Sequence, residues 1–151
     1  MIRVICVGKI KEKYFSMAIE EYVKRLSKYT NIDILELIDE GIDDPKVVLK
    51  KEKEKLLKYI DAKSYVILLD REGKEFSSLD LANKIDSILV HNSNIVFIIG
   101  GSYGVDDEVK QKANLSISFS KLTFPHQLFR IILLEQIYRA FKILNNESYH
   151  K

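Results

Sequence analysis

The feature that most constrains this chain is a set of short, wholly apolar runs separated by longer amphipathic segments. Val4–Val7, Val66–Leu69 and Ile95–Ile99 are apolar at every position. Strands covered on both faces have this pattern, whereas strands with one solvent face alternate apolar and polar residues. The regular alternation of such runs with amphipathic segments predicts an α/β fold, with a mostly parallel sheet flanked by helices.

Five strands are predicted, at Ile2–Gly8, Ile32–Leu37, Tyr65–Asp70, Asn94–Ile99 and Leu115–Ser118. The second of them mixes apolar and acidic residues and therefore suits an edge of the sheet. The chain of 151 residues is long enough to bury a core, and it contains no repeat or linker that would divide it. We therefore expect a single domain over residues 1–151.

The segments between the strands predict helices. Apolar residues share one helical face over residues 15–26 and again over residues 48–60. Ser77 and Asp80 resemble a capping box that opens a helix ending near Val90. Asp106 and the two acids that follow it favour the first turn of a short helix, where the helix dipole attracts negative charge.

The last helix is predicted to begin near Phe124-Pro125, because proline is tolerated in a first turn, and to end near Asn145-Asn146. Its apolar residues lie on two sides: Phe129, Leu133, Ala140 and Leu144 on one, and Leu128, Ile132 and Ile143 opposite or at the flank. So broad an apolar surface indicates burial on two sides. One side can pack on the sheet, and the other predicts a second copy of the chain, as in a homodimer.

Composition excludes several classes of protein and site. The apolar runs are far shorter than the ~20 residues of a membrane-spanning helix, and the N-terminus lacks a signal-peptide pattern. Cys6 is the only cysteine, and the three histidines are widely spaced, so neither a disulfide within the chain nor a metal site is expected. These features predict a cytoplasmic protein without membrane or metal partners.

The net charge of +2 conceals basic segments. Residues 1–30 carry seven Lys and Arg against three Glu, and residues 46–60 carry six Lys against two Glu. Such segments permit a phosphate-rich partner, and they are equally typical of solvated helix faces.

Three loops at the predicted carboxyl ends of strands are candidates for a ligand site. They are Leu69–Gly73, Gly100–Gly104 and Phe119–His126. In parallel α/β sheets ligands bind at this edge, and glycine lets a ligand approach the backbone. A tight turn that needs glycine for its geometry is the alternative interpretation of Gly100–Gly104.

Five segments together resemble one known family: Val7–Tyr14, Ile99–Gly104, Leu115–His126, Glu135–Phe141 and the ending Tyr149-His150-Lys151. The family is that of the large-subunit ribosomal RNA methyltransferase H, of the SPOUT class. The resemblance implies a C-terminal trefoil knot, a homodimer, and methylation of N3 of a pseudouridine in 23S rRNA with S-adenosylmethionine. The region Asp39–Val48 is shorter than the family pattern, which affects only the expectation for peripheral RNA contacts.

Carried over by position, the resemblance assigns residues to three roles. The cofactor-binding residues would be Leu69, Gly100, Phe119, Ser120, Lys121, Leu122, Thr123 and Phe124. Residues that position the substrate would be Glu135, Arg139, Tyr149 and His150, with His150 suited to positioning or deprotonating N3. RNA contacts would come from His126, Arg130 and Lys151.

Plain structural interpretations of the same residues remain open. Glu135 and Arg139, four residues apart, can form an ordinary helix pair, and the last three residues can be a frayed end. A tail that becomes ordered only over the target base is our expectation. The chain has no separate RNA-binding module, so we expect it to act on assembled ribosomes. The alternatives are a non-catalytic RNA-binding or ribosome-assembly factor on the same scaffold, and a tRNA methyltransferase.

Overall fold

A five-stranded sheet forms the centre of the computed structural model, which describes all residues 1–151. Its strands are β1 (Ile2–Val7), β2 (Ile32–Leu37), β3 (Ser64–Glu75), β4 (Asn94–Ile99) and β5 (Leu115–Ser118). They lie in the order β2-β1-β4-β3-β5, and every neighbouring pair is parallel. The predicted α/β class is confirmed, and the mixed strand β2 does lie at an edge.

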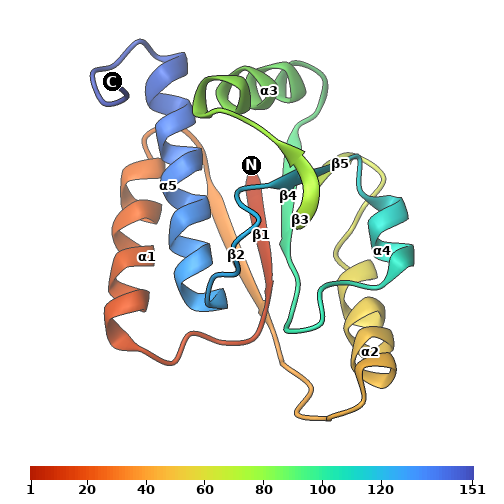
Figure 1. Cartoon of the computed structure of the whole chain (residues 1–151). Coiled ribbons are helices and arrows are strands. Elements are labelled where there is room, and N and C mark those ends of the chain that lie inside the picture. Colours follow the sequence, from red (N-terminus) through yellow and green to blue (C-terminus); the bar gives the residue numbers. More distant parts are fainter.

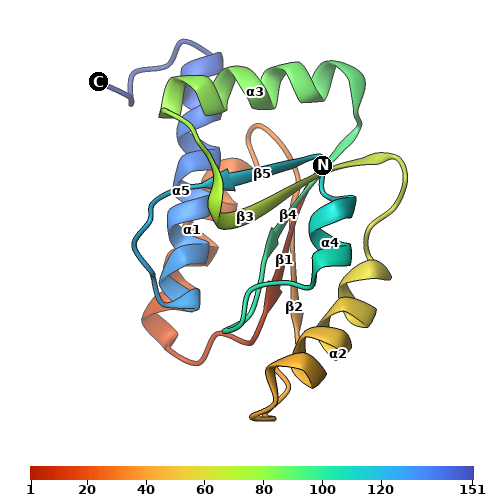
Figure 2. The same cartoon turned by 45° about the vertical axis from the view of Figure 1, so that its right-hand side comes forward.

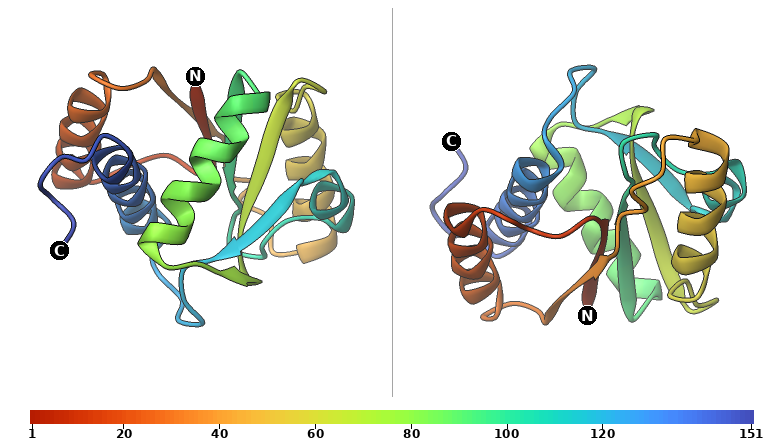
Figure 3. Two further views of the ribbon diagram at one scale, coloured as in Figure 1. Left: turned by 90° about the horizontal axis from the view of Figure 1, so that it is seen from above. Right: turned by 90° about the horizontal axis from the view of Figure 1, so that it is seen from below.

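Helices cover both faces of this sheet (Figures 1 and 3). One face carries α1 (Lys13–Leu26), α3 (Ser78–His91) and α5 (His126–Leu144), and the other carries α2 (Pro45–Leu57) and α4 (Asp107–Lys112).

Successive strand residues pack into different cores. Val4 and Phe97 belong to the core beneath α5, whereas Ile5 and Ile98 belong to the smaller core beneath α2 and α4. The central strands are apolar throughout because each of their faces is buried.

The helix boundaries follow the local sequence signals closely. The Ser77 hydroxyl accepts a hydrogen bond from the Asp80 backbone N–H at 3.0 Å, which confirms Ser77 as the start of the helix. The Asp80 carboxylate accepts from the Ser77 hydroxyl at 2.8 Å, whereas in a full capping box it would accept from the Ser77 backbone N–H. Pro125 was expected in the first turn of α5, but it is the N-cap residue, one position before that turn. Its ψ of 137° is extended and not helical. The helix ends at Leu144, and Asn146 then adopts a positive φ of 53°.

Strand β3 is longer than its apolar run predicts: it continues to Glu75, so the expectation that it ends near Asp70 is wrong. Its pairing with β5 is interrupted, because Leu69 and Lys74 both lie opposite Ile117 and residues 70–73 protrude between them. A Cβ at Gly73 would come within 2.7 Å of the Ile117 backbone, so glycine is required where the strands close again. The protruding residues are polar, which is why the apolar pattern stops short of the strand's true end.

Helix α5 is covered mostly within the chain. It packs against both α1 and α3, and Leu133, Leu134 and Ile137 on it are fully buried (Figure 2). On the second apolar side, Ile143 packs partly buried against the same core, while Leu128 remains 37% exposed. No helix in the structure has the length and apolar character needed to cross a bilayer.

Candidate active site

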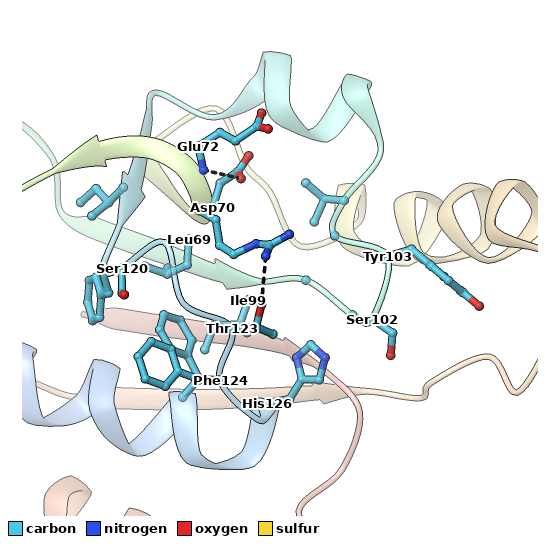
Figure 4. A pocket seen from close by; sticks show the side chains of 18 of the residues that line it. Leu69, Asp70, Glu72, Ile99, Ser102, Tyr103, Ser120, Thr123, Phe124 and His126 are labelled. Carbon is cyan, nitrogen blue, oxygen red and sulfur yellow. Dashed lines mark hydrogen bonds between the residues drawn. The ribbon is translucent and has the colours of Figure 1, made fainter.

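A cavity of about 450 Å³ opens at the carboxyl end of the sheet (Figure 4). Three segments that are distant in sequence line it: Leu69–Glu72 in β3, Ile99–Val105 after β4, and the connection between β5 and α5. These are the three loops that the sequence predicts at this edge, and the structure brings them together. The cavity volume lies within the range of small-molecule sites.

The connection between β5 and α5 is held in place by its own hydrogen bonds. The Ser118 hydroxyl donates to the Ser120 carbonyl at 3.2 Å, and the Ser120 hydroxyl accepts from the Leu122 backbone N–H at 3.0 Å. Arg71 donates from Nη1 to Thr123 Oγ1 at 2.9 Å, which ties this segment to the protruding part of β3 (Figure 4).

An aromatic cluster forms the apolar wall of the cavity. The ring of Phe129 lies 5.4 Å from that of Phe119 and 5.9 Å from that of Phe124, centre to centre. Leu122 is 71% exposed beside this wall, so a large apolar side chain faces solvent at the mouth of the cavity. This combination of rings and free aliphatic surface suits a flat, partly apolar ligand.

The glycines after β4 are required by close contacts. A Cβ at Gly100 would come within 2.7 Å of the Gly104 carbonyl oxygen, so this glycine allows the loop to fold back on itself. A Cβ at Gly101 would come within 2.9 Å of Glu52 Oε1. Gly104 has a φ of 78°, which favours glycine. Tyr103 points away from Thr123 and His126 (Figure 4).

Most residues expected to bind the cofactor line this cavity. They are Leu69, Gly100, Phe119, Ser120, Leu122, Thr123 and Phe124. Lys121 belongs to the same segment, but its side chain is exposed and outside the lining. The turn of the chain between β5 and α5 directs the Lys121 side chain to solvent, although its neighbours Ser120 and Leu122 line the cavity.

The two basic residues expected at the start of α5 have different environments. His126 lines the cavity, and burial together with the nearby Arg130 guanidinium lowers its pKa. Arg130 is only 1% exposed: Nη1 donates to Glu36 Oε2 at 2.6 Å and Nη2 to the Gly8 carbonyl at 2.6 Å. The Arg130 side chain is thus buried and occupied by these two partners, so this placement does not support its expected RNA contact.

The predicted substrate-positioning residues form one cluster at the far end of α5. Glu135 accepts hydrogen bonds from Arg139 Nη2 at 2.7 Å and from the Tyr149 hydroxyl at 3.0 Å. Arg139 also lies over the Tyr149 ring at 4.7 Å and contacts His150 Nδ1 at 3.2 Å. The burial of Tyr149 and its bond to Glu135 raise its pKa to about 12.

The tail is folded in the free protein, which corrects the expectation that it becomes ordered only over a target base. Glu147 accepts from Lys142 Nζ at 2.5 Å and from the Tyr29 hydroxyl at 2.7 Å, and these bonds lower its pKa to about 2. Tyr149 packs edge-on against Tyr138, with ring centres 5.0 Å apart. The exposed Lys151 ends the chain beside this cluster.

The cavity and the tail cluster do not meet within one protomer. His126 stands at the first residue of α5 and Arg139 further along it, a separation of about 20 Å at about 1.5 Å per residue. Figure 1 shows the C-terminus near the end of α5 that is opposite to its start. One chain alone therefore presents the two halves of the expected site separately.

The sequence interpretation missed the buried carboxylate of Glu52. It is 2% exposed, neither oxygen has a hydrogen-bond partner, and burial raises its pKa to about 7. A signal was present: Val48, Glu52 and Leu56 follow one another at four-residue spacing on the buried face of α2. No group of three or more His, Cys, Asp or Glu side chains is arranged to hold a metal ion.

Comparison with known proteins gives consistent matches over the whole chain. Residues 1–150 match the family described as predicted SPOUT methyltransferase. The chain is 51% identical to the ribosomal RNA large subunit methyltransferase H of Caldicellulosiruptor saccharolyticus, with 100% of both sequences covered. It is 48% identical to the protein of that name from Clostridium botulinum strain Kyoto, over 99% of each sequence.

A solved structure supports the fold. A probable methylase family protein from Haemophilus influenzae Rd KW20 aligns with a TM-score of 0.57, covering 99% of this chain and 70% of that one at 14% identity. Such low identity bears on the fold alone. The full-length sequence matches and the parallel α/β fold together show that this chain belongs to the ribosomal RNA large subunit methyltransferase H family of SPOUT methyltransferases.

Proposed function

We propose that this protein transfers a methyl group from S-adenosylmethionine to N3 of a pseudouridine in 23S rRNA, acting on assembled ribosomes in the cytoplasm. The observation that carries the proposal is the cavity at the carboxyl end of the sheet, in a chain whose relatives are named as rRNA methyltransferases.

The cavity fits the chemistry of this cofactor. Its volume suits a nucleoside-sized ligand, and the rings of Phe119 and Phe124 offer an apolar wall for an adenine. Backbone groups of the turn at Ser120–Thr123 offer hydrogen-bond partners beside that wall. S-Adenosylmethionine supplies a methyl group already activated on a sulfonium, so the chain's own task is to align the acceptor base and to manage its proton.

The tail cluster supplies groups for positioning a base. Arginine has only donor hydrogens, so His150 Nδ1 must accept from Arg139, and the ring proton of a neutral His150 then lies on Nε2. In this tautomer His150 donates a hydrogen bond to a carbonyl of the base. His150 is therefore better suited to positioning than to removing the N3 proton.

A homodimer would bring the two halves of the site together. Leu128, Ile132, Glu135 and Arg139 follow one stripe of α5 from the cavity end to the tail cluster, and none of them is fully buried. Packing this stripe against that of an antiparallel second copy would place the tail of one protomer near the cavity of the other. The exposed Leu128 supports this arrangement.

We also infer the trefoil knot of the SPOUT class. The segment Phe119–Pro125 lies against the protruding residues of β3 through the Arg71–Thr123 hydrogen bond, as a threaded chain would require. An experimental structure tests this inference. If the path of its backbone is shortened geometrically with both chain ends held fixed, a trefoil knot must remain, and a path that straightens without a knot would contradict the inference.

Mass spectrometry of 23S rRNA from cells with and without this gene tests the function. The expected result is one N3-methylpseudouridine present only with the gene.

In vitro, tritiated S-adenosylmethionine should label assembled ribosomes and label naked 23S rRNA poorly. Deleting Tyr149–Lys151 should abolish labelling while the dimer and cofactor affinity persist. Full-rate labelling by the truncated dimer would show that the tail is only a chain end.

The second candidate is a non-catalytic ribosome-assembly factor on the same scaffold. The exposed side chain of Leu122 at the cavity argues for a bound ligand whether the protein is an enzyme or an assembly factor. Ribosome binding without any transfer of label, in a protein that binds S-adenosylmethionine, would favour this alternative.

A further inference from the structure

A short basic segment follows β1 at the same edge of the sheet as the cavity. It contains Lys9, Lys11 and Lys13, all of them exposed and none of them in a salt bridge. Glu12 is the only acid among them. By contrast, several lysines on α2 are already paired with carboxylates, for example Lys55 with Glu40. The segment after β1 therefore carries uncompensated positive charge.

The backbone of this segment is fastened to the protein. Gly8 turns the chain with a φ of 96°, and its carbonyl accepts from the buried Arg130 at 2.6 Å. The Ile10 N–H donates to Glu36 Oε2 at 2.7 Å, and the same carboxylate oxygen accepts from Arg130. The lysines therefore stand on a backbone with a defined conformation.

A second fastening joins the segment to the first turn of α5. The Gln127 side-chain oxygen accepts from the backbone N–H of Lys11 at 3.0 Å and from that of Glu12 at 3.3 Å. Gln127 directly follows His126, which lines the cavity. The backbone that carries the exposed lysines is thus tied to the start of α5, which borders the cavity. In the view from below in Figure 3, the chain between β1 and α1 runs beside the start of α5.

We propose that Lys9, Lys11 and Lys13 form a preformed docking surface for the phosphate backbone of ribosomal RNA, and that Arg130, Glu36 and Gln127 are its positioning residues. This rests on the proposed function for the identity of the RNA. An exposed row of ammonium groups recognises phosphate by charge rather than by base sequence. Its fixed place would orient the RNA so that one base reaches the cavity.

Ribosome binding over a range of salt concentrations tests the proposal directly. The variant Lys9→Gln/Lys11→Gln keeps every backbone hydrogen bond of the segment and removes two charges. Its matched control is Lys58→Gln/Lys63→Gln, which removes two exposed, unpaired lysines near the amino end of β3. We expect the first variant to bind ribosomes about tenfold more weakly and with a salt dependence reduced by roughly one to two charges. The control should match the wild-type protein.

The positioning role is tested with Gln127→Leu, which removes the acceptor while keeping a side chain of similar size. We expect a raised KM for ribosomes, with the Kd of S-adenosylmethionine and the kcat at saturating ribosomes unchanged. A merely structural defect would instead lower cofactor affinity and thermal stability together.

The outcomes separate this proposal from the proposed function. Three results would overturn the docking surface. The Lys9→Gln/Lys11→Gln variant could bind ribosomes as tightly as the wild-type protein, the control could lose as much affinity as that variant, or the wild-type protein could fail to bind ribosomes at all. Weaker binding by the lysine variant alone, without methyl transfer by the wild-type protein, would support the surface and reject the proposed reaction.

Discussion

The carboxylate of Glu52 occupies the space that a side chain at Gly101 would need, with Oε1 2.9 Å from the position of a Cβ there. Glu52 comes from α2 and Gly101 from the loop that borders the cavity. The buried Glu52 carboxylate therefore lies against the loop that borders the cavity, and it limits the size of the side chain that position 101 can carry.

Gly101→Ala should destabilise the protein by about 1–3 kcal/mol, because its methyl group would lie 2.9 Å from Glu52 Oε1 and 3.2 Å from Val7 Cγ1, so buried side chains must shift. Glu52→Ala opens that space, so the double variant should lose less than the sum of the two single variants, by about 1 kcal/mol. Urea unfolding of the four proteins measures this coupling. Strict additivity would show that the two residues do not compete for the same space.

Glu52 should also make stability depend on pH. Its pKa rises from 4.5 to about 7 on folding, mainly through burial and then through the charge of Asp39. Between these values the folded chain holds more protons than the unfolded chain, so stability falls as the pH rises from about 4.5 to about 7.

Glu52→Gln should remove that dependence. Relative to wild type, its free energy of unfolding should gain about 1–3 kcal/mol between pH 4.5 and pH 8. Urea titrations at both pH values check this, with the exposed Glu54→Gln as the matched control. A difference between variant and wild type that is the same at both pH values would contradict the assignment.

Gly73→Ala should cost about 1–3 kcal/mol or more, because its Cβ would lie 2.7 Å from backbone atoms of Ile117, which cannot move aside as a side chain can. Gly41→Ala provides the control, since no atom lies within 4 Å of a Cβ there. Thermal unfolding should separate the two variants clearly. Equal melting temperatures would show that β3 and β5 can shift apart.

Leu122→Ala should weaken binding of S-adenosylmethionine about tenfold, through the loss of apolar contact at the mouth of the cavity. Leu79→Ala is matched to it, because Leu79 is 51% exposed on α3 outside the cavity. Calorimetry with the cofactor measures both. A substitution at Gly100 would be less informative, because a Cβ there would lie 2.7 Å from the Gly104 carbonyl oxygen and disturb the loop itself.

Glu147→Gln should loosen the tail, because the bonds from Lys142 and Tyr29 to this carboxylate hold it against α5. The anchoring is fully present above about pH 4.5, and it is lost as the pH falls through the lowered pKa of about 2. Hydrogen exchange of the Glu147 N–H, which donates to the Lys142 carbonyl at 3.0 Å, should speed up roughly tenfold in the variant at neutral pH. Asp86→Asn, on an exposed surface of α3, should leave the exchange unchanged.

Local and periodic features of the fold could be predicted from the sequence. Apolar runs located the strands, the mixed run of β2 located an edge, and Ser77 located a helix start. Neighbouring strand ends also brought the three loops into one cavity. Each of these depends on residues close in sequence or on the general geometry of parallel sheets.

Features that depend on distant partners could not be predicted. The second part of β3 is ordered by the backbone of β5, which its own polar sequence does not indicate. Arg130 is buried because Glu36, distant in sequence, neutralises it. The tail is folded because α5 presents Glu135 and Lys142 to it.

In the homodimer that we propose, the length of α5 has a genetic consequence. Consider two defective variants: one keeps its cavity but lacks a working tail, and the other keeps its tail but has a damaged cavity. Each would be inactive as a pure homodimer. Coexpressed, they would pair at random, and every mixed dimer would hold one complete centre. About a quarter of normal activity should therefore return from two dead alleles, a complementation that no arrangement confined to single chains could produce.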